Sequence, residues 1–349
     1  MKYIFRLSIY ICLLLSVIFL PAAADYAVYT TNREPLSGQM EGIPENAGVV
    51  TIYVASVITE KNLQLPSDRG ITELIIVPAD GMGSISLPEV ERICANGVPL
   101  VIGQGISMEN ASIYGGACVS ETESDLASSD LTIEGSVGFV FGGGLATDGG
   151  HSGVTETSVT LTKTGLVYFE IFGGGHAYGS GSSASAESTS LKISGTSDYV
   201  LGGGFAEEGG LAECGSTYIT AEEGSSVPVA LFTGGSASGA GSLSEVESAK
   251  ALVAGNANWA FSGDFAFGGG KTILNLASRL EILPSGSTEI AYMGSFSSDE
   301  GSDALVNTAE LMVCGEASRI VQDSQTADNG KALTQVKALF SCEQGEKAP

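Results

Sequence analysis

The feature that most limits the fold of this chain is a glycine stop that recurs about every thirty residues. Each stop follows a short apolar stretch, as in Phe139-Val140-Phe141-Gly142-Gly143-Gly144. Counted from the residue after the last large apolar one, the stops begin at positions 142, 173, 202, 233, 262 and 293, in steps of 31, 29, 31, 29 and 31. A fixed period of this size is typical of units that bury no core alone and must stack on their neighbours.

Each unit has room for three short strands. The first carries two apolar residues spaced by two, such as Leu131 and Ile133, which is the alternation of a half-buried strand. A turn glycine follows, for example Gly135, and then the more aromatic strand that runs into the stop. The remaining residues, such as 177–187, are rich in Ala, Ser, Gly and Glu and accommodate a third strand with its loops. This pattern predicts an all-β fold, a single-stranded parallel β-helix with about 30 residues per coil.

Stacked coils place equivalent residues about 4.8 Å apart, so like side chains form ladders. The register predicts one interior ladder, made of Phe141, Phe172, Leu201, Phe232, Phe261 and Met293. At the corners we expect glycine, because a sharp bend often needs a positive φ that glycine adopts freely. The predicted corner glycines are Gly142, Gly173, Gly202, Gly234, Gly263 and Gly294.

The first 24 residues resemble a removable signal peptide. Lys2 and Arg6 precede an apolar stretch of 14 residues, and small residues at 21–24 form a cleavage site. An uncleaved anchor is the alternative, although 14 residues are short for a bilayer. We therefore expect a secreted, extracellular or cell-surface protein with no membrane span after signal removal.

The period divides the rest of the chain. Within the predicted β-helix, 87–95 is either a short helix or an insertion, and near the C-terminus 332–340 has a weak helical spacing. The expected parts are a lead-in or cap at 25–47, the β-helix at 48–320 with irregular coils over 48–130 and regular repeats over 131–320, and a C-terminal cap and polar tail at 321–349.

The charge of the chain restricts its partners. Without the signal, 13 Lys and Arg stand against 40 Asp and Glu, a formal charge of −27. A field of this sign makes nucleic acid and anionic lipid poor partners, whereas it attracts cations and basic partners. Solubility of a secreted protein accounts for the same composition.

Five cysteines remain after the signal, too few and too scattered for a disulfide framework. Cys94 and Cys118 are 24 residues apart, and Cys314 and Cys342 are 28 apart, close to one repeat in both cases. Either pair could bridge neighbouring coils if the register brings the Cα atoms within about 7 Å. Cys214 is left over.

Acidic residues concentrate in the segment after each stop. If the coils are in register, they line one edge of the rod, where carboxylate oxygens would suit Ca²⁺. The alternative is a solvated loop edge, because the Gly/Asp spacing of Ca²⁺-binding nonapeptide repeats is absent. The Ca²⁺ candidates are Asp148, Glu156, Glu207, Glu208, Asp299, Glu300 and Asp303.

Catalytic motifs are lacking. The chain has no G-x-S-x-G elbow, no H-E-x-x-H, no C-x-x-C and no phosphate-binding loop, so the sequence predicts no catalytic residue and no cofactor site. The two histidines, His151 and His176, are interpreted as surface residues because no Cys or His spacing supports zinc. Pairs of carboxylates 5 to 9.5 Å apart, as a glycosidase needs, would arise by accident in stacked coils.

The signal, the strand–glycine–strand–Gly-Gly period and the Ser/Ala/Gly loops over 48–320 resemble the glycine-rich β-helix repeats of bacterial secreted adhesin-like proteins and autotransporter passengers, an architecture shared with pectin-lyase-like enzymes. The resemblance is one of architecture, since no single residue is diagnostic. It implies a non-catalytic solenoid that binds a glycan or protein on an external surface. The alternatives are a carbohydrate-active β-helix hydrolase or lyase that uses surface carboxylates, and a structural envelope component.

Overall fold

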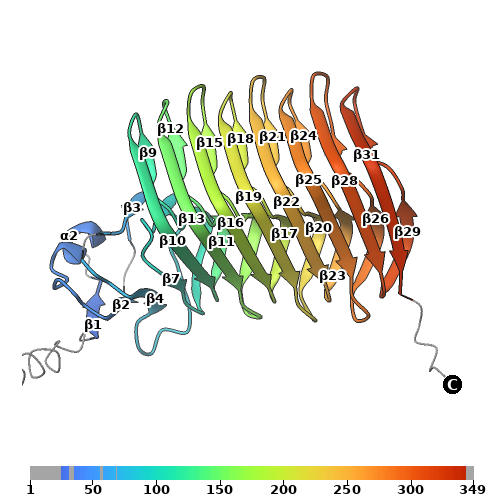
Figure 1. The fold of residues 1–349 in the computed structure, drawn as a ribbon. Coiled ribbons are helices and arrows are strands. Elements are labelled where there is room, and N and C mark those ends of the chain that lie inside the picture. The colour runs from blue at the N-terminus through green and yellow to red at the C-terminus, as the bar shows by residue number, and fades with distance from the viewer. Residues whose placement is uncertain (1–24, 31–34, 56–57, 68, 343–349) are drawn as a thin grey trace, which may run out of the picture.

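The computed structural model describes residues 25–30, 35–55, 58–67 and 69–342 of the chain. Over these residues the chain forms a parallel β-solenoid of about 10 turns with roughly 29 residues per turn (Figure 1). The predicted fold class is therefore confirmed. The predicted signal at 1–24 and the end of the polar tail, 343–349, lie outside the described residues.

Three parallel sheets run along the solenoid, and we call them A, B and C. Sheet A has 12 strands, in the order β1 (Tyr26–Tyr29), β2 (Val49–Val54), β4 (Glu73–Pro78), β7 (Leu100–Ile102), β10 (Glu123–Ile133), β13 (His151–Leu161), β16 (Ser183–Ile193), β19 (Leu211–Ala221), β22 (Leu243–Val253), β25 (Lys271–Ile282), β28 (Asp303–Val313) and β31 (Lys331–Ser341).

Sheet B has 11 strands, one of which, β5 (Ile85–Ser86), lies off the main path and pairs with β8. The others are, in chain order, β3 (Asn62–Gln64), β6 (Arg92–Cys94), β8 (Ile106–Tyr114), β11 (Ser136–Phe141), β14 (Leu166–Phe172), β17 (Thr196–Leu201), β20 (Ser226–Phe232), β23 (Asn256–Phe261), β26 (Ser287–Tyr292) and β29 (Glu316–Val321).

Sheet C has eight short strands: β9 (Cys118–Ser120), β12 (Leu145–Thr147), β15 (His176–Tyr178), β18 (Phe205–Glu207), β21 (Ser236–Ser238), β24 (Phe265–Phe267), β27 (Phe296–Ser297) and β30 (Gln325–Thr326). The Ala/Ser-rich residues after each stop are divided between this sheet and the next strand of sheet A. The three strands of a coil are consequently unequal in length: β15, for example, has 3 residues and the following β16 has 11.

The two ends of the solenoid differ. At the N-terminal end, β1 pairs with β2, and α2 (Leu36–Glu41) buries Leu36 and Met40 in the main core. Residues 87–95 form neither a helix nor an insertion outside the sheets, because they contain the short strand β6, which pairs with β3 and β8 within sheet B. The helical spacing of 332–340 is misleading, because this segment lies within β31 and pairs with β28.

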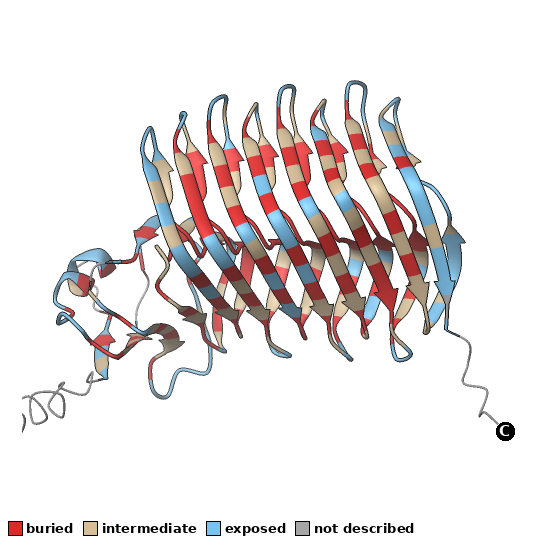
Figure 2. Ribbon diagram, viewed as in Figure 1, coloured by how far each residue is buried: buried red, intermediate tan, exposed pale blue. Residues whose placement is uncertain are grey.

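The main core fills the inside of the solenoid. Its aliphatic ladders come from inward positions of sheets A and B, such as Ile133, Leu161 and Ile193 in sheet A, and Figure 2 shows the resulting bands of buried residues across the stacked strands. Disulfides Cys94–Cys118 and Cys314–Cys342 join neighbouring turns near the two ends of the regular stack, with Cα atoms 5.8 Å and 4.8 Å apart. Both bridges that the cysteine spacing allowed are thus formed, and Cys214 is a buried free thiol.

The aromatic ladder forms in the predicted register with one exception. Phe141, Phe172, Leu201, Phe232 and Phe261 pair in sequence, but the next member is Tyr292, because Met293 is one residue further on and packs in the main core. The ladder is buried, yet it belongs to a second apolar cluster outside the main core, so its predicted interior position is wrong.

The reason given for the corner glycines also needs correction. Of the six, Gly294 alone has a positive φ, 144°. The glycines are instead required by close packing: a Cβ on Gly142 would lie 2.2 Å from the carbonyl oxygen of Gly173 and 3.0 Å from Thr157 Oγ1 of sheet A. The six also occupy two adjacent ladder positions, since Gly142, Gly173 and Gly202 align with Thr233, Ser262 and Met293, and Gly234, Gly263 and Gly294 follow one residue later.

Candidate binding site in the angle between sheets B and C

The second apolar cluster lies outside the solenoid, in the angle between sheets B and C. Neighbouring residues of a strand point to opposite faces, and Val140 is in the main core, so Phe141 points outward. In sheet C, Ala206 packs inward on Ala212 of sheet A, and Phe205 therefore points outward too. The outward side chains of the two sheets meet there, as the 5.4 Å between the rings of Phe172 and Phe205 shows.

Three outward ladders build this cluster. The first is the aromatic ladder at the end of sheet B. The second, in sheet C, is Cys118, Leu145, His176, Phe205, Ser236, Phe265 and Phe296. The third, two residues before the first in sheet B, is Glu170, Tyr199, Ala230, Trp259 and Ile290.

A hollow opens where two of these ladders carry small residues in the same turn. Ala230 separates Tyr199 from Trp259, and Ser236 separates Phe205 from Phe265. Two strand spacings of about 4.8 Å place the backbones of Tyr199 and Trp259 about 10 Å apart. The hollow has a volume of about 160 Å³, and we call it the aromatic hollow; it is lined by Tyr199, Val229, Ala230, Phe232, Trp259, Phe261, Phe265 and Phe296.

The aromatic rings around the hollow differ in whether their faces are free to contact a ligand. Phe232, Phe261 and Tyr292 stack face to face, with centroids 4.5 Å and 4.2 Å apart, so their faces are occupied by one another. Trp259 is not stacked face to face in this way, because its plane makes an angle of 78° with that of Tyr292. The residue is 37% exposed. Among the described residues, no ring is stacked on Tyr199. Trp259 and Tyr199 thus offer apolar ring surface to a ligand.

A polar cluster interrupts the same angle two turns nearer the N-terminus. His176 lies between the rings of Phe141 and Phe205, at 5.2 Å and 5.0 Å. Its Nδ1 is 3.2 Å from the Tyr114 hydroxyl and its Nε2 is 3.3 Å from a carboxylate oxygen of Glu207. The interpretation of His176 as a surface residue is wrong, since 13% of its side chain is exposed.

Glu170 adds a second carboxyl group to this polar cluster. Burial and, to a smaller extent, the negative charge of Glu207 together raise the pKa of Glu170 to about 7. A carboxyl group that is partly protonated at neutral pH therefore stands near an acidic neighbour on the adjacent sheet. His151, the other histidine, lies on sheet A, where it contacts Ser183 Oγ at 2.7 Å and Asp125 at 3.3 Å.

The Ca²⁺ candidates are spread over the loop edge and sheet A. Asp148, Glu208 and Asp299 occupy equivalent loop positions with positive φ, and Asp148 accepts a hydrogen bond from Ser120 while Asp299 accepts one from the Gly268 amide. Glu300 follows in the same loop and Glu156 lies within β13. The remaining two have other partners, His176 for Glu207 and Lys271, at 3.7 Å, for Asp303.

Carboxylates line a separate hollow on the outer face of sheet A. It has a volume of about 380 Å³, and its lining includes Asp125, Glu187 and Glu213 together with Gly153 and Gly215. Within the described part of the chain, no three His, Cys, Asp or Glu side chains are grouped so that they could hold a metal ion. Its lining residues belong to strands of sheet A, whereas those of the aromatic hollow belong to sheets B and C, so the two hollows lie on different sheets.

Comparison with known proteins gives no match at three levels: no protein family, no curated protein and no solved structure matches the chain. None of the helices in the described ranges is long and apolar enough to cross a membrane.

Sequence reasoning did not find the aromatic hollow. The sequence predicts a strand of small residues after each stop, whereas the residue directly after the triple glycine is large in three regular turns, as Leu145, His176 and Phe205. Aligning those positions would have shown a second aromatic row. The two small residues that open the hollow, Ala230 and Ser236, become informative only once both rows are in register.

Proposed function

We propose that the protein is a secreted, non-catalytic binding solenoid that holds an external glycan in the aromatic hollow. The observation that carries this proposal is the pair of uncovered aromatic residues, Tyr199 and Trp259, on either side of Ala230. A flat ring placed over Ala230 would lie about 5 Å from each aromatic ring, within the range of stacking contacts.

The size and charge of the site favour a neutral sugar ring. A cavity of about 150 Å³ accepts one benzene molecule, so a hollow of about 160 Å³ suits a single six-membered ring. The formal charge of −25 for the whole chain repels an acidic polysaccharide. The hollow is also part of a longitudinal row of outward side chains, which lets a longer glycan continue along the solenoid.

The proposal is tested on a glycan array with the mature protein, followed by titration of the glycans that bind. Trp259→Ala and Tyr199→Ala each remove one wall of the hollow, and we expect each to weaken binding by about tenfold or more. Tyr218→Ala is the matched control, because Tyr218 is a 40% exposed aromatic residue on sheet A. A blank array, or equal losses in all three variants, would count against the proposal.

A second candidate function, glycoside hydrolysis, is favoured by Glu170 and Glu207. A carboxyl group with a pKa raised to about 7 beside an acidic neighbour is the arrangement that general acid/base catalysis needs. Prolonged incubation of each bound glycan distinguishes the two functions. Shortened products that disappear with Glu170→Gln would identify an enzyme, whereas unchanged glycans support a binding protein.

A further inference from the structure

The last turn of the solenoid leaves the edges of three sheets open. β31, β29 and β30 are the final strands of sheets A, B and C, and no described strand pairs with their outer edges. β31 is the longest of them, with 11 residues. The free N–H and C=O groups of such an edge are a template for another strand.

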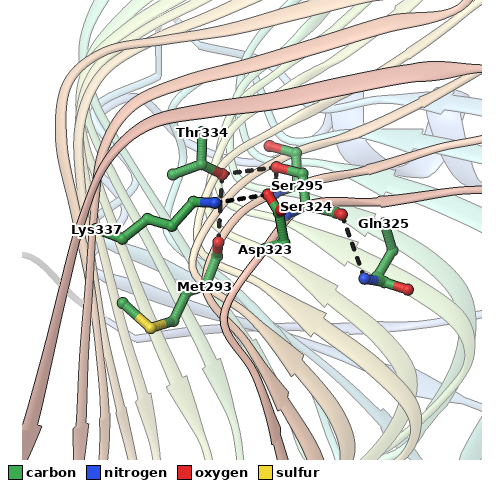
Figure 3. A network of polar contacts seen from close by, with 7 residues as sticks. All are labelled: Met293, Ser295, Asp323, Ser324, Gln325, Thr334 and Lys337. Atoms are coloured by element: carbon green, nitrogen blue, oxygen red, sulfur yellow. Dashed lines mark hydrogen bonds and ion pairs between the residues drawn. The ribbon is translucent and has the colours of Figure 1, made fainter.

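Hydrogen bonds and an ion pair hold this edge in the register of the turns before it (Figure 3). Thr334 of β31 donates to the carbonyl oxygen of Met293 and lies 2.6 Å from Ser324 Oγ, which connects β31 to the corner between sheets B and C. Lys337 Nζ is 2.7 Å from Asp323. The disulfide Cys314–Cys342 fixes the end of β31 to the preceding turn. An edge that is already ordered loses little conformational entropy when a partner binds.

The outer face of sheet A becomes apolar towards this end. One ladder reads Glu213, Glu245, Ile273, Leu305 and Leu333 along successive turns. In Figure 2 the last strand is largely exposed. We define the terminal apolar patch by three exposed residues of β31, Leu333 (57%), Val336 (55%) and Phe340 (47%). Several exposed apolar side chains next to an open strand edge are typical of an association site.

Charge favours contact at this end over contact along the rod. Residues 314–342 hold three acids and three bases, so the last turn is formally neutral in a chain of charge −25. Two copies that meet side by side would repel each other, whereas two copies that meet at their last turns would not. The chain's own residues 343–349, Glu-Gln-Gly-Glu-Lys-Ala-Pro, supply no large apolar side chain to cover the patch.

From these observations we propose that two copies of the chain join end to end, with β31 of one pairing antiparallel to β31 of the other. The antiparallel arrangement brings the terminal apolar patches of the two copies together, and its two-fold symmetry closes at a dimer. Head-to-tail pairing is disfavoured because α2 buries Leu36 and Met40 in the core at the N-terminal end. The dimer is a continuous rod of about 20 turns.

The test is light scattering of the full mature chain after size exclusion at about 1 to 100 μM, with small-angle X-ray scattering for the shape. We expect a dimer whose solenoid is about 100 Å long, against about 50 Å for a monomer of about ten turns. The double variant Leu333→Glu/Phe340→Glu places four carboxylates in the interface and is expected to raise the dissociation constant by about tenfold or more. Both side chains are exposed, so the monomer should keep its fold, which circular dichroism and thermal melting check.

The matched control is Tyr218→Glu, an equivalent change on the same sheet in a central turn, which should leave dimerisation unchanged. A monomer at every concentration would overturn the proposal. So would a dimer that persists in the double variant, a dimer no longer than the monomer, or an open series of longer polymers.

Discussion

Asp264 occupies a ladder position that is held by Gly235 in the preceding turn and by Ser295 in the following turn. It is 1% exposed, Oδ1 accepts a hydrogen bond from the Gly235 amide, and Oδ2 has no partner. Burial raises the pKa of Asp264 to about 8, although the Gly235 hydrogen bond opposes part of this rise. The unfolded chain therefore loses this proton near pH 4, whereas the folded chain keeps it up to about pH 8.

The consequence is a pH-dependent cost in stability. Between about pH 4 and pH 8 the folded state binds more protons than the unfolded state, so the free energy of unfolding falls as the pH rises. Asp264→Ser removes this titration, and Ser295 shows that serine fits, since its Oγ accepts from the Asp264 amide in the equivalent position. Relative to wild type, we expect the variant to gain up to about 1.4 kcal/mol per pH unit over this range. Urea titrations at pH 5, 6, 7 and 8 measure the difference.

The comparison isolates one group, because Glu170, the other carboxyl group whose pKa is raised, is present in both proteins. Ser295→Ala is a control at the equivalent position of the next turn that removes no titratable group, and its difference from wild type should not depend on pH. Parallel pH profiles for wild type and Asp264→Ser would show that Asp264 is not buried in its neutral form.

At the scale of the strands and corners, the glycine stops act through packing. A Cβ on Gly173 would lie 2.2 Å from the carbonyl oxygen of Gly202 and 2.7 Å from Thr189 Oγ1. Neither oxygen atom can move away easily to make room for the Cβ. Gly202 belongs to the stacked corner, and Thr189 donates a hydrogen bond to the carbonyl oxygen of Gly202. We expect Gly173→Ala to lower the free energy of unfolding by about 2 kcal/mol or more, as measured by denaturant titration.

Gly83→Ala is the matched control for this glycine. Its added Cβ would meet no atom within 4 Å, and its φ is not in the left-handed region. The substitution should change stability by less than about 0.5 kcal/mol. Equal effects in the two variants would mean that corner packing does not explain the stops.

The same elements show what the sequence can and cannot predict. The period and the alternation of Leu131 and Ile133 are enough for the fold, because stacking forces equivalent residues into register. They do not predict the direction in which the Phe141 side chain points. Which face of a strand lies inside depends on how closely the corner approaches sheet A, and contacts such as the hydrogen bond from Thr157 to Gly173 set this distance. The aromatic hollow depends on that direction, so sequence reasoning could not locate it.

The whole molecule carries its negative charge along a rod about 50 Å long, and repulsion within the rod opposes folding. Raising NaCl from about 10 mM to about 150 mM shortens the screening length from about 30 Å to about 8 Å. We therefore expect the melting temperature to rise by a few degrees over this range, measured by calorimetry. A variant such as Glu208→Gln/Glu300→Gln, which removes two charges from the loop edge, should show a smaller rise.

Divalent cations separate general screening from a specific site. Because the described carboxylates of the loop edge do not gather in threes, we expect CaCl₂ and MgCl₂ at equal ionic strength to raise the melting temperature equally. A larger rise with Ca²⁺ alone would contradict this and would indicate the carboxylate site that the sequence suggested. If the double variant Asp299→Asn/Asp303→Asn abolished this Ca²⁺-specific rise, the site would lie in the loop after β27. If the rise remained in that variant, Asp148 and Glu156, nearer the middle of the rod, would be the next residues to replace.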